Sequence, residues 1–425
     1  MILRSRIVVP INRPPVEDGA VCISGERISW VGPRREMPAT VRDGAEVDLG
    51  EVILMPGLVN AHCHLDYTDM AGQIPPRKSF VDWIKSMVAL KGSWSVEEFA
   101  ASWRRGAEML VRTGTTTVAD IEAVPELLPS AWRATPLRVV SFRELINVKA
   151  RQPPVELVER AVNDWLGLSE ATGRVGLSPH APYTTSAELL EQASRAAQRR
   201  NWRLTTHVAE SEQEFEMFMY RQGAMFEWLK GQRDMADCGH GSPVQHLERC
   251  GYLDGNLLAV HVNYLWRHDA GVLGRSGASV AHCPRSHDYF RHLRFPFQEL
   301  VEAGVNICLG TDSLATVRSE RAAKPELDMF AEMAAFAGKH SDLAPDRIVR
   351  MATVNGAQAL GRQGQAGELI QGALADVIAI PFSGGAGEAF AAMVNHSGSV
   401  AASMIGGAWA LAPGSPIARV ASETC

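Results

Sequence analysis

Two histidines, His62 and His64, are separated by one residue and directly follow an apolar run that ends in Leu58-Val59-Asn60-Ala61. The run predicts a buried strand, and alternate residues of a strand face the same side, so both imidazoles leave its end together. Two neutral imidazoles placed in this way supply half of the ligands of a divalent transition-metal site. The alternative is a pair of core or surface histidines that are neighbours by chance.

Further β-like runs follow along the chain, separated by stretches long enough for a helix, as at 187–199. They lie at 115–120, 137–143, 175–179, 204–208, 257–262, 278–282 and 305–309. With the first strand they make eight βα units, a pattern typical of a distorted (β/α)8 TIM barrel of the α/β class. Polar residues stand where these runs stop: His180, His207, Glu210, His261 and Asp312. Active sites of such barrels lie at the carboxyl ends of the strands, so this clustering indicates a site.

The two ends of the chain carry a different pattern. Residues 1–56 contain β-like runs at 2–9, 20–24 and 27–31, and residues 366–425 contain another at 375–380 and a hairpin at 403–410. Neither end has enough alternating apolar residues to close a core alone. We therefore expect a small β-sandwich domain built from 1–56 and 366–425, with the barrel inserted at 57–365.

Composition narrows the class of protein. A net charge of −6 argues against binding nucleic acid or an anionic membrane through a basic surface. The first residues do not follow the signal-peptide pattern and no apolar run approaches the length of a membrane span, so we expect neither feature. Its seven cysteines are an odd number without CxxC spacing, which favours a cytoplasmic protein with reduced thiols. The expected partner is a small-molecule substrate, and a homodimer is compatible with this interpretation.

Several motifs, in this order, resemble the amidohydrolase superfamily, specifically its mononuclear-metal aminohydrolase branch of methylthioadenosine, adenosylhomocysteine and aminofutalosine deaminases. They are Met55-Pro-Gly-Leu-Val-Asn-Ala-His-Cys-His64, Ser178-Pro-His-Ala-Pro-Tyr183, His207-Val-Ala-Glu210, Ala281-His-Cys-Pro-Arg-Ser286 and Gly310-Thr-Asp-Ser313. HxH alone is a weak signal, but HxH, HVAE and GTDS together are specific.

The resemblance implies that His62, His64, His207 and Asp312 hold one divalent metal per chain, zinc or alternatively iron. Three nitrogen donors and one carboxylate that leave a position open for water form a catalytic zinc site. Dinuclear relatives need a bridging lysine at the end of the fourth strand. That strand ends here in Ser178-Pro179-His180, and Lys149 is poorly placed.

The resemblance also implies that Glu210 carries protons and that His261 and Asp312 orient and deprotonate the attacking water. For Glu210 the alternative is a carboxylate favoured by a helix dipole, and Glu212 is a rival acid more suited to solvation. For His261 the alternative is a buried, hydrogen-bonded histidine.

Substrate contacts are expected from His180, Arg285 and His287 on loops over the same barrel face. Trp83 could wall the pocket or belong to the core. Arg143, with Glu144, ends the third strand and could form an ion pair near the pocket or reach a substrate hydroxyl.

The first functional hypothesis is a hydrolytic deaminase that releases ammonia from an aminated purine nucleoside or related heterocycle, with aminofutalosine ranked first. The second is a chlorohydrolase or amidase acting on triazine-like or guanidino substrates. Retention of Glu210 favours the first, because an amine must be protonated to leave whereas chloride need not be. The third is a non-catalytic scaffold, which the loss of a metal ligand would signal.

Overall fold

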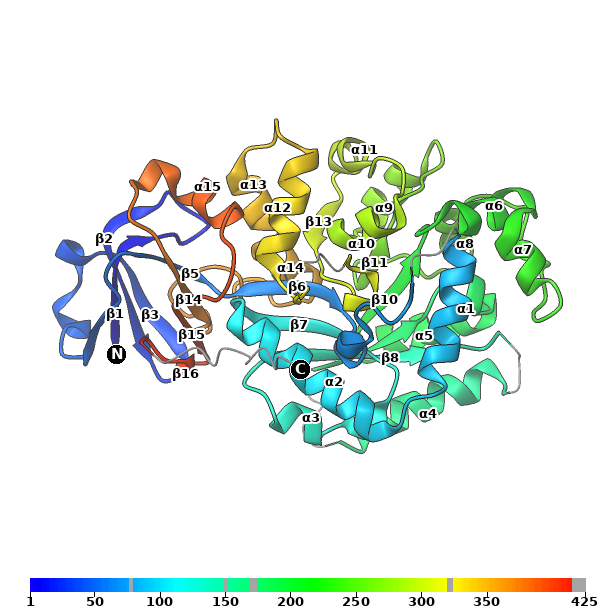
Figure 1. The fold of residues 1–425 in the computed structure, drawn as a ribbon, viewed down its shortest axis with the longest axis horizontal. Coiled ribbons are helices and arrows are strands. Elements are labelled where there is room, and N and C mark those ends of the chain that lie inside the picture. Colours follow the sequence, from blue (N-terminus) through cyan, green and yellow to red (C-terminus); the bar gives the residue numbers. More distant parts are fainter. Residues whose placement is uncertain (76–78, 149–151, 169–173, 319–323, 415–425) are drawn as a thin grey trace, which may run out of the picture.

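The computed structural model describes residues 1–75, 79–148, 152–168, 174–318 and 324–414, so Lys149 lies outside it. Two eight-stranded sheets lie next to each other, a barrel and a smaller sheet (Figure 1). The predicted fold class, a (β/α)8 barrel with a sandwich built from both chain ends, is confirmed. The domain boundaries 1–56, 57–365 and 366–425 stay a prediction.

The barrel consists of parallel strands that pair in chain order. They are β6 (Leu58–Cys63), β7 (Thr115–Glu122), β8 (Arg138–Leu145), β9 (Val175–Pro179), β10 (Arg203–Val208), β11 (Leu257–His261), β12 (Ser279–His282) and β13 (Asn306–Leu309). The first and last strands meet at a parallel bridge between Cys63 and Asp312, where the Asp312 N–H donates to the His62 carbonyl at 3.0 Å. The seam of the barrel therefore closes at the predicted site.

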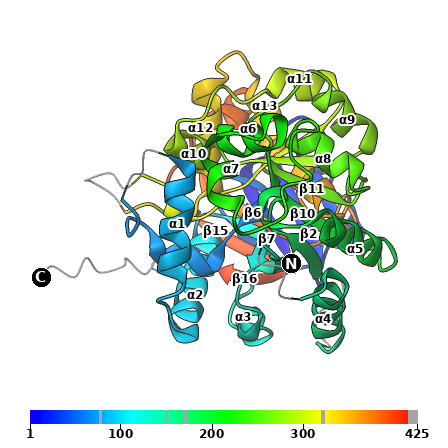
Figure 2. The same cartoon turned by 90° about the vertical axis from the view of Figure 1, so that its right-hand side faces the viewer.

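Helices surround the strands of the barrel, as the view along it shows (Figure 2). They are α1 (Phe80–Lys91), α2 (Val96–Arg112), α3 (Ser130–Arg133), α4 (Pro154–Leu166), α5 (Ala187–Gln198), α6 (Glu212–Tyr220), α7 (Gly223–Leu229), α8 (Pro243–Arg249), α9 (Asp269–Ser276), α10 (Pro284–Phe290), α11 (Phe297–Glu302), α12 (Met329–Lys339), α13 (Pro345–Met351) and α14 (Val354–Ala359). In α2, Ser95 and Glu98 form a capping box, and Phe99, Trp103 and Leu110 bury one face.

The smaller sheet combines strands from both ends of the chain. They are β1 (Ile2–Val8), β2 (Val16–Ser24), β3 (Arg27–Pro33), β4 (Glu46–Asp48), β5 (Val52–Pro56), β14 (Val377–Pro381), β15 (Ala402–Ile405) and β16 (Ala408–Leu411), with α15 (Ala389–Val394) between β14 and β15. Antiparallel pairing of β5 with β14 joins the two ends. The N–H of Ala375 donates to the Glu26 carbonyl, and the carbonyl of Ala375 accepts from the Gly407 N–H. Ala375 therefore connects the β3 end of the sheet with the hairpin of β15 and β16, and the sheet curls around its own apolar cluster.

The apolar run before His62 forms two strands rather than one. It changes sheets at Gly57, between β5 and β6. A Cβ on Gly57 would lie 2.1 Å from the Thr116 hydroxyl oxygen, so the crossing requires glycine here. The crossing sends β6, and with it His62, into the barrel.

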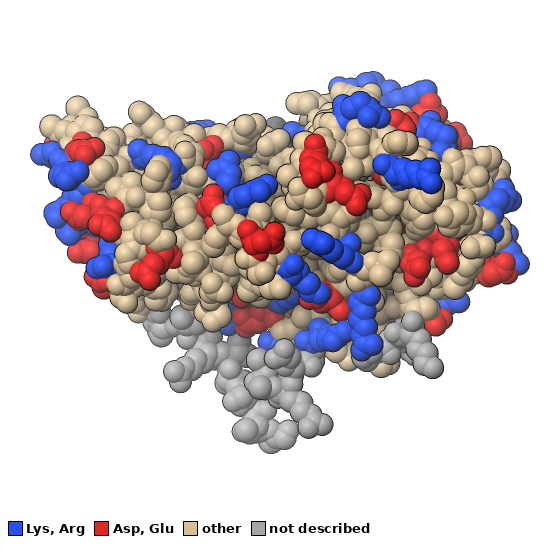
Figure 3. Space-filling model, turned by 90° about the horizontal axis from the view of Figure 1, so that it is seen from above, with Lys and Arg blue, Asp and Glu red and all other residues tan. Residues whose placement is uncertain are grey.

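On the face of the molecule drawn in Figure 3, positive and negative side chains are interspersed.

Within the described residues, no helix is long and apolar enough to cross a membrane. The six cysteines that the structure describes are unpaired, and Cys425 lies outside it.

Candidate metal centre and active site

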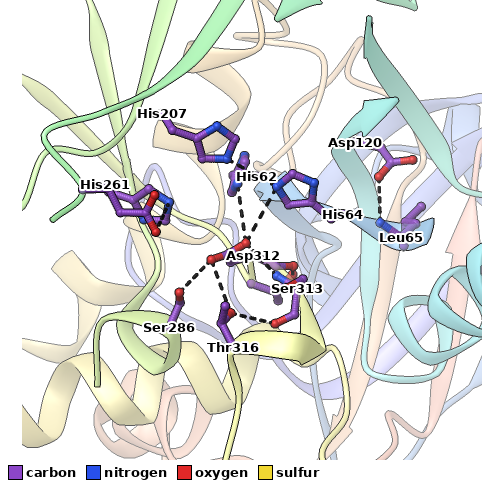
Figure 4. Close-up of polar contacts among 12 residues, drawn as sticks. His62, His64, Leu65, Asp120, His207, His261, Ser286, Asp312, Ser313 and Thr316 are labelled. Carbon is purple, nitrogen blue, oxygen red and sulfur yellow. Dashed lines mark hydrogen bonds and ion pairs between the residues drawn. The ribbon is translucent and has the colours of Figure 1, made fainter. Parts of the chain in front are cut away.

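The predicted site residues converge at the carboxyl ends of four barrel strands (Figure 4). His62 lies in β6 with His64 one residue past its end, and His207 lies in β10. His261 ends β11, and Asp312 follows β13. All are buried, with exposed fractions of 6% or less. Parallel strands in register thus bring together residues up to 250 positions apart, shown by the pairing of His207 with Val260 next to His261.

Three imidazoles face one another at metal-binding distances. One ring nitrogen each of His62, His64 and His207 lies within 4.8 Å of the others, and Nε2 of His64 is 3.3 Å from Nε2 of His207. Asp312 Oδ1 lies 3.8 Å from Nε2 of both His62 and His64. This set has the ligand types and number of a catalytic zinc site.

Protonation states and unsatisfied atoms agree with a metal at this place. Burial, followed by neighbouring imidazoles, lowers the pKa of His62 and of His64 well below its ordinary value, so both rings are in the neutral form that can bind a metal. In the described part of the chain, neither ring nitrogen of His62 nor Nδ1 of His64 has a hydrogen-bond partner. Buried polar atoms without partners are costly, and coordination of a cation removes that cost. The residues therefore fit a divalent metal.

A hydrogen bond orients the third imidazole. Nδ1 of His207 lies 2.8 Å from the His180 carbonyl oxygen, which can only accept. Nδ1 therefore carries the proton, and Nε2 presents its lone pair toward His64. Such a backbone contact selects the tautomer that binds metal.

Asp312 is held by polar contacts on both carboxylate oxygens. Oδ2 accepts from Ser286 Oγ at 2.7 Å and from Thr316 Oγ1 at 3.3 Å, and Oδ1 accepts from Ser313 N–H at 2.8 Å. Its backbone is left-handed, with φ 54°. Residues other than glycine are rarely found in this region, and such strain is concentrated at functional sites.

Glu210 and His261 lie beside the three imidazoles, with the ring centre of His261 5.8 Å from that of His62 and 5.5 Å from that of His207. Glu210 Oε1 is 3.6 Å from His261 Nε2, and both lie within 4.8 Å of an Asp312 oxygen. Left-handed backbone at Ala209 (φ 50°), His261 (φ 74°) and Val262 (φ 50°) turns the two strand ends toward each other.

The ionisation of these two groups is set mainly by burial. Burial, with Asp312 and Glu214 nearby, raises the pKa of Glu210 well above its ordinary value. Burial, then His207 and His62, lowers the pKa of His261. A carboxyl group that holds its proton at neutral pH can act as a general acid. The rival Glu212 is exposed at the start of α6, which suits its predicted solvation.

A cavity of about 780 Å³ opens over this cluster, within the size range of small-molecule sites. His64, His207, Glu210, His261 and Asp312 form its polar floor. Apolar side chains form much of the wall: Phe80, Trp83, Ile84, Met87, Val88, Ile146, Val148, Leu157, Trp228 and Leu229.

Two of the predicted substrate contacts line this cavity. His180 does so, and burial lowers its pKa to about 3, so its ring is neutral. Trp83 does so too, with its ring against Phe290 and its buried indole N–H without a partner among the described residues. Both side chains are available to a bound substrate.

Arg285, His287 and Arg143 do not belong to the described lining of the cavity, which argues against the substrate contacts expected of them and leaves Arg143 its alternative, an ion pair. Arg285 turns toward α12, where Nε lies 2.5 Å from Oε1 of the buried Glu332. His287 lies with its ring against His282 and His292. Arg143 points outward to Asp164 on α4, at 3.4 Å.

The new role of Arg285 is structural and can be tested. Replacing Arg285 with Met should lower the free energy of unfolding by about 3–5 kcal/mol, because a buried carboxylate loses its counter-charge. Burial already raises the pKa of Glu332 to about 7 against the opposing effect of Arg285. The folded chain binds a proton at Glu332 more tightly than the unfolded chain does, so at pH 5 the buried carboxyl group is protonated and needs no counter-charge. The variant should therefore lose more stability at pH 8 than at pH 5. Urea unfolding followed by tryptophan fluorescence measures both effects.

A double variant, Arg285→Met with Glu332→Gln, serves as the control for this prediction. It should recover much of the lost stability, because no buried charge remains unpaired. Equal unfolding free energies for wild type and Arg285→Met would contradict the assignment.

Sequence reasoning named Glu144 only together with Arg143, with an ion pair or a substrate hydroxyl as the contact, and it gave no role in the site to Lys91, Ser286 or Glu214. Glu144 and Lys91 line the cavity, Ser286 holds Asp312, and Glu214 accepts a hydrogen bond from Glu210 N–H at 2.9 Å. For Glu144 a signal existed in the alternation of β8, where Val140 and Phe142 belong to the inner cluster of the barrel. Because side chains alternate between the two faces of a strand, Glu144 points inward with Val140 and Phe142, and Arg143 points outward.

The model of the amidohydrolase family matches residues 53–410. A 5-methylthioadenosine/S-adenosylhomocysteine deaminase of Syntrophobacter fumaroxidans is 31% identical over 383 residues, which cover 86% of this chain and 80% of that protein. A 5'-deoxyadenosine deaminase of Methanothrix thermoacetophila is 28% identical over 388 residues, covering 89% and 85%.

Among solved structures, an adenosine deaminase from Xanthomonas campestris with bound zinc has the same fold. It aligns with a TM-score of 0.79 at 25% identity, covering 96% of this chain and 92% of that chain.

Proposed function

This chain belongs to the amidohydrolase family, and on that premise we propose that it is a metal-dependent hydrolytic deaminase of 6-aminopurine nucleosides. The observation that carries the proposal is the buried Glu210 carboxyl group, whose Oε1 lies 3.6 Å from His261 Nε2, beside the three imidazoles of His62, His64 and His207. The deaminase names of the relatives support the same reaction class.

We propose that His62, His64, His207 and Asp312 hold one divalent metal. A metal bound there would supply a Lewis acid that makes water a strong nucleophile at neutral pH. Zinc is our first choice, supported by the zinc-bound neighbour, and iron is the alternative.

The remaining chemistry belongs to the side chains. Glu210 donates a proton to the ring nitrogen beside the amino-bearing carbon, which makes that carbon electrophilic. Asp312 and His261 orient the attacking water, and its proton returns to Glu210. The water oxygen bonds to the carbon, Glu210 passes the proton to the amino group, and the carbon–nitrogen bond breaks to release ammonia. The remaining proton of the new hydroxyl group passes to Glu210 as the carbonyl forms, which restores the protonated carboxyl group. In unrelated zinc deaminases, too, the metal activates the water while a glutamate that does not bind the metal transfers the protons.

The cavity bears on the choice of substrate. Arg285, the expected substrate contact that could pair with an anionic 5' group, does not line the described cavity. The walls are largely apolar instead. We therefore rank nucleosides with an apolar 5' group, such as 5'-methylthioadenosine or 5'-deoxyadenosine, ahead of aminofutalosine. The cytoplasmic location and the homodimer stay predictions.

A substrate panel tests the proposed function. Ammonia release should be faster for 5'-methylthioadenosine and 5'-deoxyadenosine than for adenine, guanine or cytosine, by at least about tenfold in kcat/KM, because sugar contacts worth ~1.4 kcal/mol give that ratio. A chlorotriazine assayed for chloride release examines the chlorohydrolase alternative. Higher kcat/KM for a free base or for the triazine would reject the nucleoside proposal, and absence of bound metal would favour the scaffold.

A further inference from the structure

The cavity wall contains one ion pair apart from the cluster on its floor, among the residues that the structure describes. Lys91 ends α1 and Glu144 lies near the end of β8, and both line the cavity. Lys91 Nζ is 3.6 Å from Glu144 Oε2, and the two side chains are 26% and 8% exposed. The Lys91 ammonium also lies 4.7 Å from the centre of the Tyr67 ring. None of the steps of deamination described above uses this pair.

Strand geometry explains why Glu144 enters the cavity. Phe142, two residues before Glu144, belongs to the inner cluster of the barrel. Arg143, which lies between Phe142 and Glu144, points away from the barrel and contacts Asp164 of α4. Glu144 pairs in register with Ser178 of β9, so its carboxylate lies at the same strand ends as the metal cluster. It is therefore placed to contact a part of the substrate next to the reacting ring.

Glu144 is an anion at this place. Burial alone would raise the pKa of its carboxyl group, but the groups around it, Lys91 foremost, outweigh burial, and the pKa is lowered. An ionised carboxylate only accepts hydrogen bonds. At 3.6 Å the contact with Lys91 is longer than a hydrogen bond, so the carboxylate keeps accepting capacity toward the cavity.

The surroundings select which donor this carboxylate can take. The charge of Lys91 is already balanced by Glu144, so an anionic substituent would meet a neutral pair and would lose its hydration without gaining a free cation. A pair of neighbouring hydroxyl groups, in contrast, can donate to the two oxygens of one carboxylate. Apolar side chains beyond the pair, such as Met87 and Leu157, suit a substituent without charge.

We propose that Glu144 binds the vicinal hydroxyl groups of the substrate sugar and that Lys91 positions it for this contact. The proposal rests on the proposed function, because it names the part of a nucleoside that the wall recognises. It makes the 2'- and 3'-hydroxyl groups determinants of specificity.

The experiment compares 5'-methylthioadenosine with its 2',3'-dideoxy analogue on the metal-loaded protein. Wild type should favour the hydroxylated substrate by at least about 10²-fold in kcat/KM, since a site built to bind a hydroxyl strongly rejects the analogue that lacks it. Glu144→Gln should reduce this preference to within about tenfold, chiefly by losing activity on the hydroxylated substrate. Glu159→Gln, the same change on the exposed face of α4, is the matched control and should keep the wild-type preference.

Lys91 is tested as a positioning residue by rescue. Lys91→Met should lower the preference for the hydroxylated substrate, and Lys91→Arg should restore most of it, because a cation again faces Glu144. A structural role of the side-chain stem alone would predict similar results for Met and Arg, with no change in the preference between the two nucleosides.

The outcomes separate this proposal from the proposed function. If wild type deaminates both nucleosides equally, or if Glu144→Gln keeps the wild-type preference, the sugar contact is overturned while the deaminase function stands. If wild type deaminates neither nucleoside but acts on a free base or a triazine, the proposed function fails and the sugar contact fails with it.

Discussion

Replacing Glu210 with Gln should lower kcat by about 10²–10⁴-fold while metal content stays near that of wild type, because the amide can hydrogen-bond a ring nitrogen but cannot transfer a proton. Glu210 is buried, and its carboxyl group lies close to His261 and Asp312 in the site. Steady-state kinetics with 5'-methylthioadenosine, together with elemental analysis of the same preparation, measures both parts.

Glu212→Gln is the matched control for this variant. Glu212 lies two residues away but is exposed at the start of α6, so its replacement should leave kcat near the wild-type value. If Glu210→Gln keeps wild-type kcat when solvent isotope effects show that chemistry limits the rate, proton transfer depends on another group. Glu214, buried against the Glu210 backbone, would then be examined.

Replacing His207 with Ala should remove most of the bound metal and with it nearly all activity. Wild type should contain about one zinc or iron per chain, since three imidazoles and one carboxylate make one mononuclear site. His207 supplies a nitrogen 3.3 Å from that of His64, and it is one of the three imidazoles of the site. Elemental analysis after dialysis against a weak chelator measures occupancy.

The control is His240→Ala, in which an exposed histidine far from the site is lost. It should keep the wild-type metal content. Two tightly held metals per wild-type chain, or full activity without metal, would contradict the mononuclear assignment. Thermal unfolding adds a second readout, because a metal that binds only the folded chain raises its stability, and this increment should shrink in His207→Ala.

The arrangement of strands was predictable because it depends on local patterns. Short apolar runs, each followed by a helix-length stretch, mark the barrel strands, and the structure places β9 at the residues expected. The hairpin expected at Gly406-Gly407 is present between β15 and β16. The change of sheets at Gly57 was not predictable, because it depends on the close approach of Thr116, which lies 59 residues away in the chain.

Residues that end strands were predictable for a related reason. His62, His207 and His261 lie at or near the last positions of their strands, and parallel register brings such positions to one edge. Glu210 was identified because it follows His207 on the turn that leaves β10. Their types and positions in the chain were sufficient to expect a metal site with a proton carrier.

The sequence by itself determined the barrel, the ring of histidines at its strand ends and the acid beside them, since each depends on residue type and on periodicity along the strand. Only the tertiary structure decided which residues beyond the strand-end histidines face the cavity. Arg285 turns away because the buried Glu332 of α12 neutralises it, and Glu144 enters because the inner face of β8 is the one that carries Phe142. The direction of a side chain on a loop or at a strand end depends on partners distant in sequence, and one chain without its fold does not reveal those partners.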